Sequence, residues 1–485
     1  MKEKKLGLPS AVATGVGLIV ATSSLLSTGQ GTSSVGVTFI IAMVIACALN
    51  ILLALSISEL NALMPNLTGG LAQYSLASVG PFLTQIAMVG GYIICMTLVG
   101  SAECAMFGNT ICAIFPDFPV PSVVLTIGLL VVLICVNYRG VDMFAKIQNV
   151  VAYSLIISLI IMGVMGTFGL GSGTLVAQPM VLSTSFKDIS SLCGLAFFLF
   201  IGAEFVIPIA PQVKNAKRVV PKSMVLSLLI ILVMQIFLVI GFSRYIPWAE
   251  MAESSTPHIL YGTLLLGKFG TIWMLIVSML AVISSINASL SSLSYICAGM
   301  AKINMLPAFF TRTNKFGTPV FGLFIIGGAM ILINATGLST TDQLSFLILT
   351  GSVFWMISYI FAHISVLVLR KRLPRAPRSF KVWGGIILPV IGVIGTAWMI
   401  WNISSDPAQR TSIYIVCLIV FACLALFSFL WTKYVMKVPL FKPFPVNEVM
   451  AMENDDYIAH HIDKKTGRYT VSASRNLGAK ASESE

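Results

Sequence analysis

The sequence predicts an all-helical membrane protein with about twelve transmembrane helices. Hydrophobic residues make up 57% of the 485 residues and charged residues only 10%, which lies far outside the range of soluble globular domains. The basic residues fall almost entirely in alternate loops, as orientation signals do in membrane proteins. In addition, the first and the sixth apolar segments are interrupted by Gly, Ser, Thr or Pro at the depth of a bilayer.

Each crossing needs about 20 apolar residues, so each long apolar segment is taken as one span. The expected spans are residues 9–32, 36–62, 82–112, 121–138, 147–168, a broken sixth span that begins near 192, and then 223–243, 270–299, 319–336, 343–369, 384–403 and 411–433. A short amphipathic piece is expected before the fifth span, and a small lid helix in the polar loop that ends at Lys268. A polar tail begins near Lys437.

The distribution of Lys and Arg sets the orientation. With twelve spans and the N-terminus inside, 26 of the 30 basic residues lie in inner segments, and the outer four are Lys187, Arg244, Lys268 and Arg410. This asymmetry predicts that both termini are cytoplasmic and that the protein lies in the cell (inner) membrane. The net charge of +12 is therefore interpreted as a topology signal, and no nucleic-acid partner is expected beside the lipid bilayer.

The two interruptions predict a cavity inside the membrane. The first span carries Gly15, Gly17 and the run 21–24 (Ala-Thr-Ser-Ser), and the sixth carries Gly202 and two prolines near Glu204. Unpaired backbone groups cost several kcal/mol in hydrocarbon, so a helix breaks at this depth only where protein or water satisfies those groups. Two simpler alternatives stay open: a continuous first helix, and a kinked sixth helix with one buried, hydrogen-bonded Glu.

The spacing of the interruptions predicts an internal repeat. Spans 1 and 6 lie five apart and would run in opposite directions, as in inverted repeats with paired broken helices. The expected organisation is a cytoplasmic leader (1–8), a first five-helix repeat (9–168), a second inverted repeat (190–369), two extra helices (384–433) and a cytoplasmic polar tail (437–485).

Four segments in order resemble the amino acid, polyamine and organocation (APC) transporter superfamily. They are ALSISELNALMPNLTGGLAQYSLASVGPF, FFLFIGAEFVIPIAPQVKNAKRVVPKSM, GMAKINMLPAFFTRTNKFGTPVFG and LVLRKRLPRAPRSFKVWGGIILPVIG. The resemblance to a bacterial-type amino acid permease implies a leucine-transporter-like 5+5 inverted repeat with broken helices 1 and 6. It also implies a small-molecule substrate, an amino acid or a related amine, and a protein that is not an enzyme.

The resemblance places a substrate site at the two breaks. The implied substrate-binding residues are Ile19, Ala21, Thr22, Ser23, Ser101, Phe198, Ile201, Gly202 and Ser289. The family's G-S/T-G signature, whose amides hold a substrate carboxylate, reads Ala21-Thr22-Ser23 here, so the pocket should be narrower. The amides of a half-helix can still bind an anion. Phe198 is either an aromatic gate or a packing residue.

Two intramembrane acids are candidates for proton coupling or sensing. Glu204 matches the family's acidic residue after the break. Glu103, in the third span, has no counterpart in the family pattern. If it points inward, it could recognise a cationic group or share a proton with Glu204; otherwise it is a Glu near the outer end of the span, bonded to another helix.

Three departures from the family pattern leave the coupling ion open between H⁺, Na⁺ and none. Leu155 stands where proton-coupled relatives place a Lys, Tyr295 stands where an Arg is frequent, and Ser289 stands where some members carry a pocket Trp.

No cofactor or metal is expected. The nine cysteines form no CxxC, the four histidines are scattered, and no nucleotide-binding G-x-x-x-x-G-K-[ST] is present. The sequence thus predicts a secondary active transporter working by alternating access, with an exchanger of the same fold as the first alternative and an integral membrane enzyme, channel or receptor as the different-class alternative. The basic residues between 370 and 378 are expected to be inner-face anchors, and the tail either solvated or plugging the inner vestibule. The sequence does not determine the oligomeric state.

Overall fold

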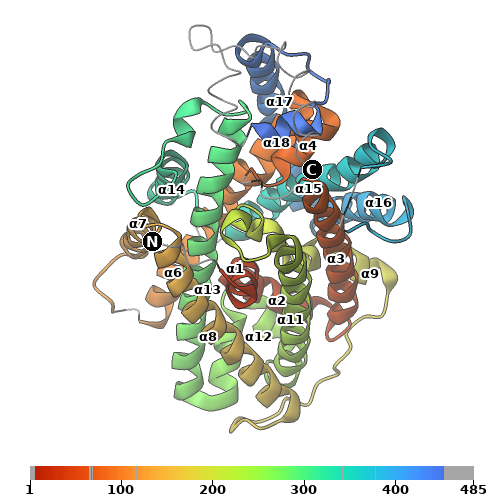
Figure 1. Cartoon of the computed structure of the whole chain (residues 1–485). Coiled ribbons are helices and arrows are strands. Elements are labelled where there is room, and N and C mark those ends of the chain that lie inside the picture. The colour runs from red at the N-terminus through yellow and green to blue at the C-terminus, as the bar shows by residue number, and fades with distance from the viewer. Residues whose placement is uncertain are drawn as a thin grey trace.

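Figure 1 shows a computed structural model of the chain, which describes residues 6–64, 67, 69–115, 117–339, 343–376, 378 and 380–452. Within these ranges the regular structure is helical, and strand-type pairing is limited to isolated bridges. Most of the leader and the tail beyond residue 452, including Glu453 and His460, lie outside the described residues.

Seven helical segments are long and apolar enough to cross a membrane, and the bent pair formed by the first two helices makes an eighth. They are α1 (Leu8–Ile19) with α2 (Thr22–Val35); α3 (Phe39–Leu63); α5 (Pro81–Met88), the π-helical turn η1 (Val89–Ile94) and α6 (Cys95–Ile114) as one run; α8 (Val141–Phe168); α11 (Ala216–Tyr245); α13 (Pro257–Lys302); α15 (Leu344–Arg372); and α17 (Pro407–Leu430) with its π-helical end η6 (Trp431–Met436). The chain is therefore a multi-pass membrane protein.

Four shorter apolar helices occupy the remaining predicted spans. They are α7 (Ser122–Tyr138), α10 (Cys193–Phe198) followed by the 3₁₀ turn η2 (Ala203–Val206), α14 (Val320–Ala335) and α16 (Ile387–Trp401). Large apolar side chains remain on the outside of the bundle, for example Val150 (69% exposed) and Leu418 (71% exposed). Such a surface suits contact with lipid tails rather than water.

Several local features differ from the sequence prediction. The amphipathic piece expected before the fifth span is continuous with it in α8, and the unpredicted helix α4 (Leu71–Val79) follows the second span. The expected small lid helix is present as α12 (Trp248–Glu253). The next element, α13, contains two helices separated by a break at Leu266 and Gly267, and the helix after the break matches the expected eighth span. The φ of Gly267, +62°, is a left-handed conformation that favours glycine.

The broken pair α1 and α2 lies in the middle of the bundle (Figure 1). Helix α1 contacts α8, α11, α13 and η2, whereas α2 contacts α6, α11 and α13. Every residue of α1 from Ala11 to Ile19 is buried. Because this part of the helix is enclosed by protein, an interruption of its backbone can be satisfied by protein groups.

The loops at the two ends of the bundle form two separate sets of contacts. One end joins the segments around residues 6 and 213, residues 140 and 316, residues 59 and 382, and residues 76 and 444. The other end joins residues 36 and 181, residues 176 and 244, residues 173 and 265, and residues 194 and 402. Residues 6 and 444 therefore belong to the same end.

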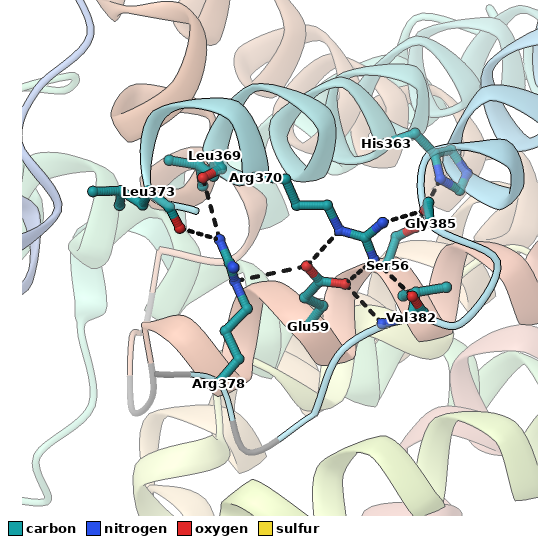
Figure 2. A network of polar contacts seen from close by, with 9 residues as sticks. All are labelled: Ser56, Glu59, His363, Leu369, Arg370, Leu373, Arg378, Val382 and Gly385. Carbon is teal, nitrogen blue, oxygen red and sulfur yellow. Dashed lines mark hydrogen bonds and ion pairs between the residues drawn. The ribbon is translucent and has the colours of Figure 1, made fainter. Parts of the chain in front are cut away.

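A buried ionic network ties two helices together at that end (Figure 2). The Glu59 carboxylate, on α3, accepts hydrogen bonds from Nε (2.8 Å) and Nη2 (2.5 Å) of Arg370 on α15 and from the amide of Val382 (2.8 Å). Nε of Arg378 lies 3.7 Å from the same carboxylate. Arg370 and Arg378 were expected to be anchors at the inner face, and their pairing with Glu59 is an additional contact that the sequence did not predict.

The first part of the predicted tail packs against the bundle. The amide of Phe82 donates to the carbonyl of Leu440 (3.1 Å), and that of Phe444 donates to Leu76 (3.2 Å). Helix α18 (Val446–Ala451) contacts α4 and buries Val449 completely. The expectation of a solvated tail is therefore wrong for the part of residues 437–452 that buries Phe444, Val449 and Met452.

Candidate functional site

The first span is broken as predicted. Helix α1 ends at Ile19, α2 begins at Thr22, and the two helices are bent by 57°. The Ser24 hydroxyl donates to the freed carbonyl of Ile19 (2.8 Å), so part of the gap is closed locally. The alternative of a continuous first helix is thus wrong.

The sixth span is broken at Gly202. Its backbone has a φ of +117°, which only glycine adopts readily, and the chain continues as the 3₁₀ turn η2 instead of an α-helix. A Cβ on Gly202 would lie 2.6 Å from Cδ2 of Leu18, so the two breaks are in direct contact. The Gly202 amide donates to the hydroxyl of Tyr359 on α15 (3.0 Å).

A small cavity of about 30 Å³ lies between the breaks and the helices α6, α13 and α15. Its walls are mostly apolar, and its polar groups come from three Ser side chains and one Glu. The lining residues are Leu18, Ile19, Ala21, Ser23, Met96, Val99, Gly100, Glu103, Phe198, Ile201, Ser285, Ile286, Ser289 and Trp355. Seven of the predicted site residues are therefore together: Ile19, Ala21, Ser23, Glu103, Phe198, Ile201 and Ser289.

Glu103 reaches the start of α2. Its Oε1 accepts a hydrogen bond from the Thr22 amide (2.7 Å) and its Oε2 accepts one from the Ser23 amide (2.9 Å). The side chain is 2% exposed. Glu103 therefore lies at the break in the first span, where the first amides of a helix have no partner within the helix, rather than at the outer end of α6.

Glu204 lies behind the cavity wall. Its Oε1 accepts from the indole nitrogen of Trp355 (2.7 Å), and its Oε2 accepts from the Tyr359 hydroxyl (2.6 Å). Trp355 lines the cavity and Glu204 does not. The two acids thus have different partners, and no hydrogen bond between Glu103 and Glu204 is found among the described residues, which gives no support to a shared proton.

Three other predicted site residues lie beside the cavity. Thr22 donates its hydroxyl to the carbonyl of Ser278 on α13 (2.9 Å). Ser101 donates to Thr97 within its own helix, and its carbonyl accepts from Asn334 of α14 (3.2 Å). The structure places Ser101 outside the cavity lining. Gly202 contributes its backbone geometry, as described above.

The tenth span, here α15, was expected to border the site, but sequence reasoning did not name Trp355 or Tyr359. These residues lie one helical turn apart and both donate to Glu204 behind the cavity wall. A sequence signal for these two residues was present. Trp and Tyr lie four positions apart in an apolar span, and the indole N–H and the phenol O–H need a hydrogen-bond partner when they are buried.

A second missed residue is Gln148 on α8. Its side-chain amide donates to the carbonyl of Ala13 on α1 (3.2 Å) and to the hydroxyl of Ser284 on α13 (2.9 Å). Its carbonyl oxygen accepts from Asn287 (3.0 Å). Neutral polar side chains of the fifth span therefore make the hydrogen bonds to α1, from Gln148, Asn149 and Tyr153, while Leu155 is fully buried.

Comparison of the sequence with known protein families identifies the family of this chain. A family model described as amino acid permease matches residues 6–423. The chain belongs to the amino acid permease family. The resemblance to the APC superfamily is thereby confirmed.

Two relatives of this permease illustrate its similarity to known transporters. It is 22% identical over 428 residues to the branched-chain amino acid permease BcaP of Bacillus subtilis (strain 168), covering 83% of this chain and 88% of BcaP. It is also 22% identical over 269 residues to the polyamine transporter PUT1 of Oryza sativa subsp. japonica, covering 54% of this chain and 48% of PUT1. The permease therefore resembles one protein named for amino acids and one named for polyamines.

The cavity of the permease is lined mainly by apolar side chains. It combines apolar walls with a few convergent polar groups, as small-molecule sites do. Within the part of the chain that the structure describes, no group of three His, Cys, Asp or Glu side chains is arranged to hold a metal ion.

Proposed function

We propose that this permease is a secondary active transporter that moves an amino acid or a related amine across the cytoplasmic (inner) membrane by alternating access. The observation that carries the proposal is the cavity enclosed by two broken apolar spans in a chain of this family. A break in a membrane helix is tolerated where the backbone borders a cavity, and such cavities hold the substrates of transporters.

The proposed site consists of the cavity-lining residues that the sequence indicated. The two breaks contribute four residues to the cavity wall, namely Ile19, Ala21, Ser23 and Ile201. Helix α13 contributes Ser289 to the same wall. Thr22 and Gly202 shape the backbone of the two breaks. Phe198, 5% exposed, is proposed to act as an aromatic gate over the cavity.

We further propose twelve spans arranged as two inverted five-helix repeats (9–168 and 190–369) followed by two extra helices (384–433). The support is the position of the two breaks, in the first and the sixth predicted span, and their direct contact at Leu18 and Gly202. In this arrangement the helices that carry the breaks move against the rest of the bundle and open the cavity to each side in turn.

Both termini are proposed to be cytoplasmic. Residues 6 and 444 lie at one end of the bundle, together with the segments that carry Lys214 and Arg370. Since basic loops stay on the cytoplasmic side, this shared end is the inner one. Cysteine-accessibility labelling of residues at each end tests this orientation.

Glu204 is proposed to couple transport to protons. It is buried against Trp355, which lines the cavity, so a change in its protonation would alter hydrogen bonds that reach the cavity wall. Sodium coupling or exchange of one substrate for another are the alternatives, and imposed gradients of each ion distinguish them.

Uptake into proteoliposomes tests the function. The purified protein should accumulate or exchange a radiolabelled amino acid or amine in a saturable manner, and counterflow from preloaded vesicles should accelerate entry. Entry that does not saturate and shows no counterflow would indicate a channel, and conversion of the label into a new compound would indicate an enzyme. If no amino acid or amine enters under any ion gradient, the proposal is wrong.

A further inference from the structure

We propose that the cavity takes an amine that carries no α-carboxylate, and that Glu103 is the residue that receives its ammonium group. This inference rests on the proposed transport function, whose substrate class it narrows. The juxtaposition that carries it is a buried carboxyl group bonded to the first amides of α2 at the edge of the cavity.

The start of α2 is the natural place for an anion in this cavity. The first amides of a helix have no partner within it, and the helix dipole attracts negative charge there. In this protein both of those amides, from Thr22 and Ser23, already donate to Glu103 at 2.7 Å and 2.9 Å. A substrate carboxylate would have to displace a buried side chain to reach them.

The Gly202 amide at the second break is also occupied. Gly202 donates to the Tyr359 hydroxyl at 3.0 Å, and that hydroxyl donates onward to Glu204. A carboxylate entering between the breaks therefore meets no free amide at Thr22, Ser23 or Gly202.

Two of the three hydroxyls in the cavity, those of Ser285 and Ser289, already use their protons and can only accept from a ligand, whereas that of Ser23 can donate or accept. The hydroxyls of Ser285 and Ser289 donate to carbonyls of their own helix at 3.1 Å and 3.0 Å, which leaves oxygen lone pairs for a ligand. The buried Ser23 hydroxyl lines the cavity without a hydrogen-bond partner. No Lys, Arg or His occurs among the lining residues.

An ammonium group matches this set of atoms. It donates up to three hydrogen bonds and accepts none, and it pairs with a carboxyl group, each of whose oxygens has a second lone pair. The rest of the wall, from Leu18, Met96, Val99, Phe198 and Ile286, is apolar. The fitting ligand is thus a primary amine on a short aliphatic chain.

Matched pairs of compounds test the proposal. The purified wild-type protein in proteoliposomes is offered valine against isobutylamine, leucine against isoamylamine, and ornithine against putrescine, each pair differing by one carboxylate. The ligands are also compared by thermal shift in detergent. We expect saturable uptake and a thermal shift for at least one amine, and an affinity weaker by about ten- to a hundredfold for its amino acid partner.

Two variants at one position separate recognition from folding. Glu103→Gln keeps the shape of the side chain but weakens its attraction for a cation, so the affinity for the amine should fall by about tenfold or more. Glu103→Ala frees the amides of Thr22 and Ser23 and should shift the preference toward the amino acid. Glu253→Gln, at an exposed position on α12, is the matched control and should leave both affinities unchanged.

The outcomes are distinguishable from failure of the transport function. If an amino acid is transported and its amine partner is neither transported nor inhibitory, the proposed function holds and the amine inference is overturned. It is also overturned if folded Glu103→Gln, checked by size exclusion and thermal melting, binds the amine as well as wild type. If neither member of any pair moves, the transport proposal itself fails.

Discussion

Arg370 and Glu59 form a two-pronged, buried ion pair between the ends of α15 and α3, with contacts of 2.8 Å and 2.5 Å. The Glu59 side chain is 2% exposed and that of Arg370 is 9% exposed. These residues lie 311 positions apart in the sequence, so the pair holds together two segments that the chain itself does not connect closely.

Removal of the arginine should destabilise the protein. Arg370→Ala leaves Glu59 with the Val382 amide and a more distant Arg378, and stranding a buried charge costs about 3 kcal/mol or more. We expect a clearly lower thermal unfolding temperature in detergent. Arg312→Ala, at an exposed arginine, is the control and should unfold like wild type; equal behaviour of the two variants would contradict the role of the pair.

Glu204 should set the pH dependence of uptake. Glu204→Gln cannot change its protonation, so the pH profile of transport into proteoliposomes should become flatter if Glu204 carries the coupling proton. An unchanged profile in a folded variant would exclude that role.

Tyr359→Phe removes one of the two side-chain donors to Glu204 and the acceptor of the Gly202 amide, and should lower stability by about 1 to 3 kcal/mol. The measurement is thermal melting in detergent. Tyr434→Phe, at a position 59% exposed on η6, serves as its control. A Tyr359→Phe variant that melts with the control would show that the hydroxyl is dispensable.

The packing of α6 on α7 should depend on Gly108. A Cβ at this residue would lie 2.2 Å from the carbonyl oxygen of Ser122, a backbone atom that cannot move aside alone. Gly108→Ala should therefore reduce the yield of monodisperse protein and its melting temperature, with a loss of about 1 to 3 kcal/mol. Gly128→Ala, where a Cβ meets nothing within 4 Å, should be neutral or slightly stabilising.

Filling the cavity should block transport. Ser289→Trp places a large side chain in a cavity of about 30 Å³ and should abolish binding of every substrate, as measured by thermal shift and uptake. Val132→Trp adds the same side chain on α7 at a position 59% exposed and should transport normally. Normal uptake by folded Ser289→Trp would mean that the substrate binds elsewhere.

Much of the helical layout could be predicted from the sequence, because long apolar runs and the alternation of basic loops depend on local composition. The breaks at residues 20–21 and at Gly202 were indicated by small residues and prolines in otherwise apolar spans. The short helix α4 was missed because it is buried by tertiary contacts, and its sequence carries no membrane-length run.

The partners within the site could not be predicted in the same way. That Glu103 bonds to Thr22 and Ser23, or that Trp355 bonds to Glu204, depends on how helices distant in sequence are rotated against each other. Periodicity places a residue on a helix face, but it does not say which helix that face meets. The packing of residues 437–452 was missed for the same reason, since it depends on contacts with α4 and α5, which lie far away in the sequence.

The closure of the first break by side chains of the same protein has a consequence for binding there. The amides of Thr22 and Ser23 and the carbonyl of Ile19 already have hydrogen-bond partners within the protein. A molecule that binds at these groups must therefore displace the Glu103 carboxyl group or bond to it.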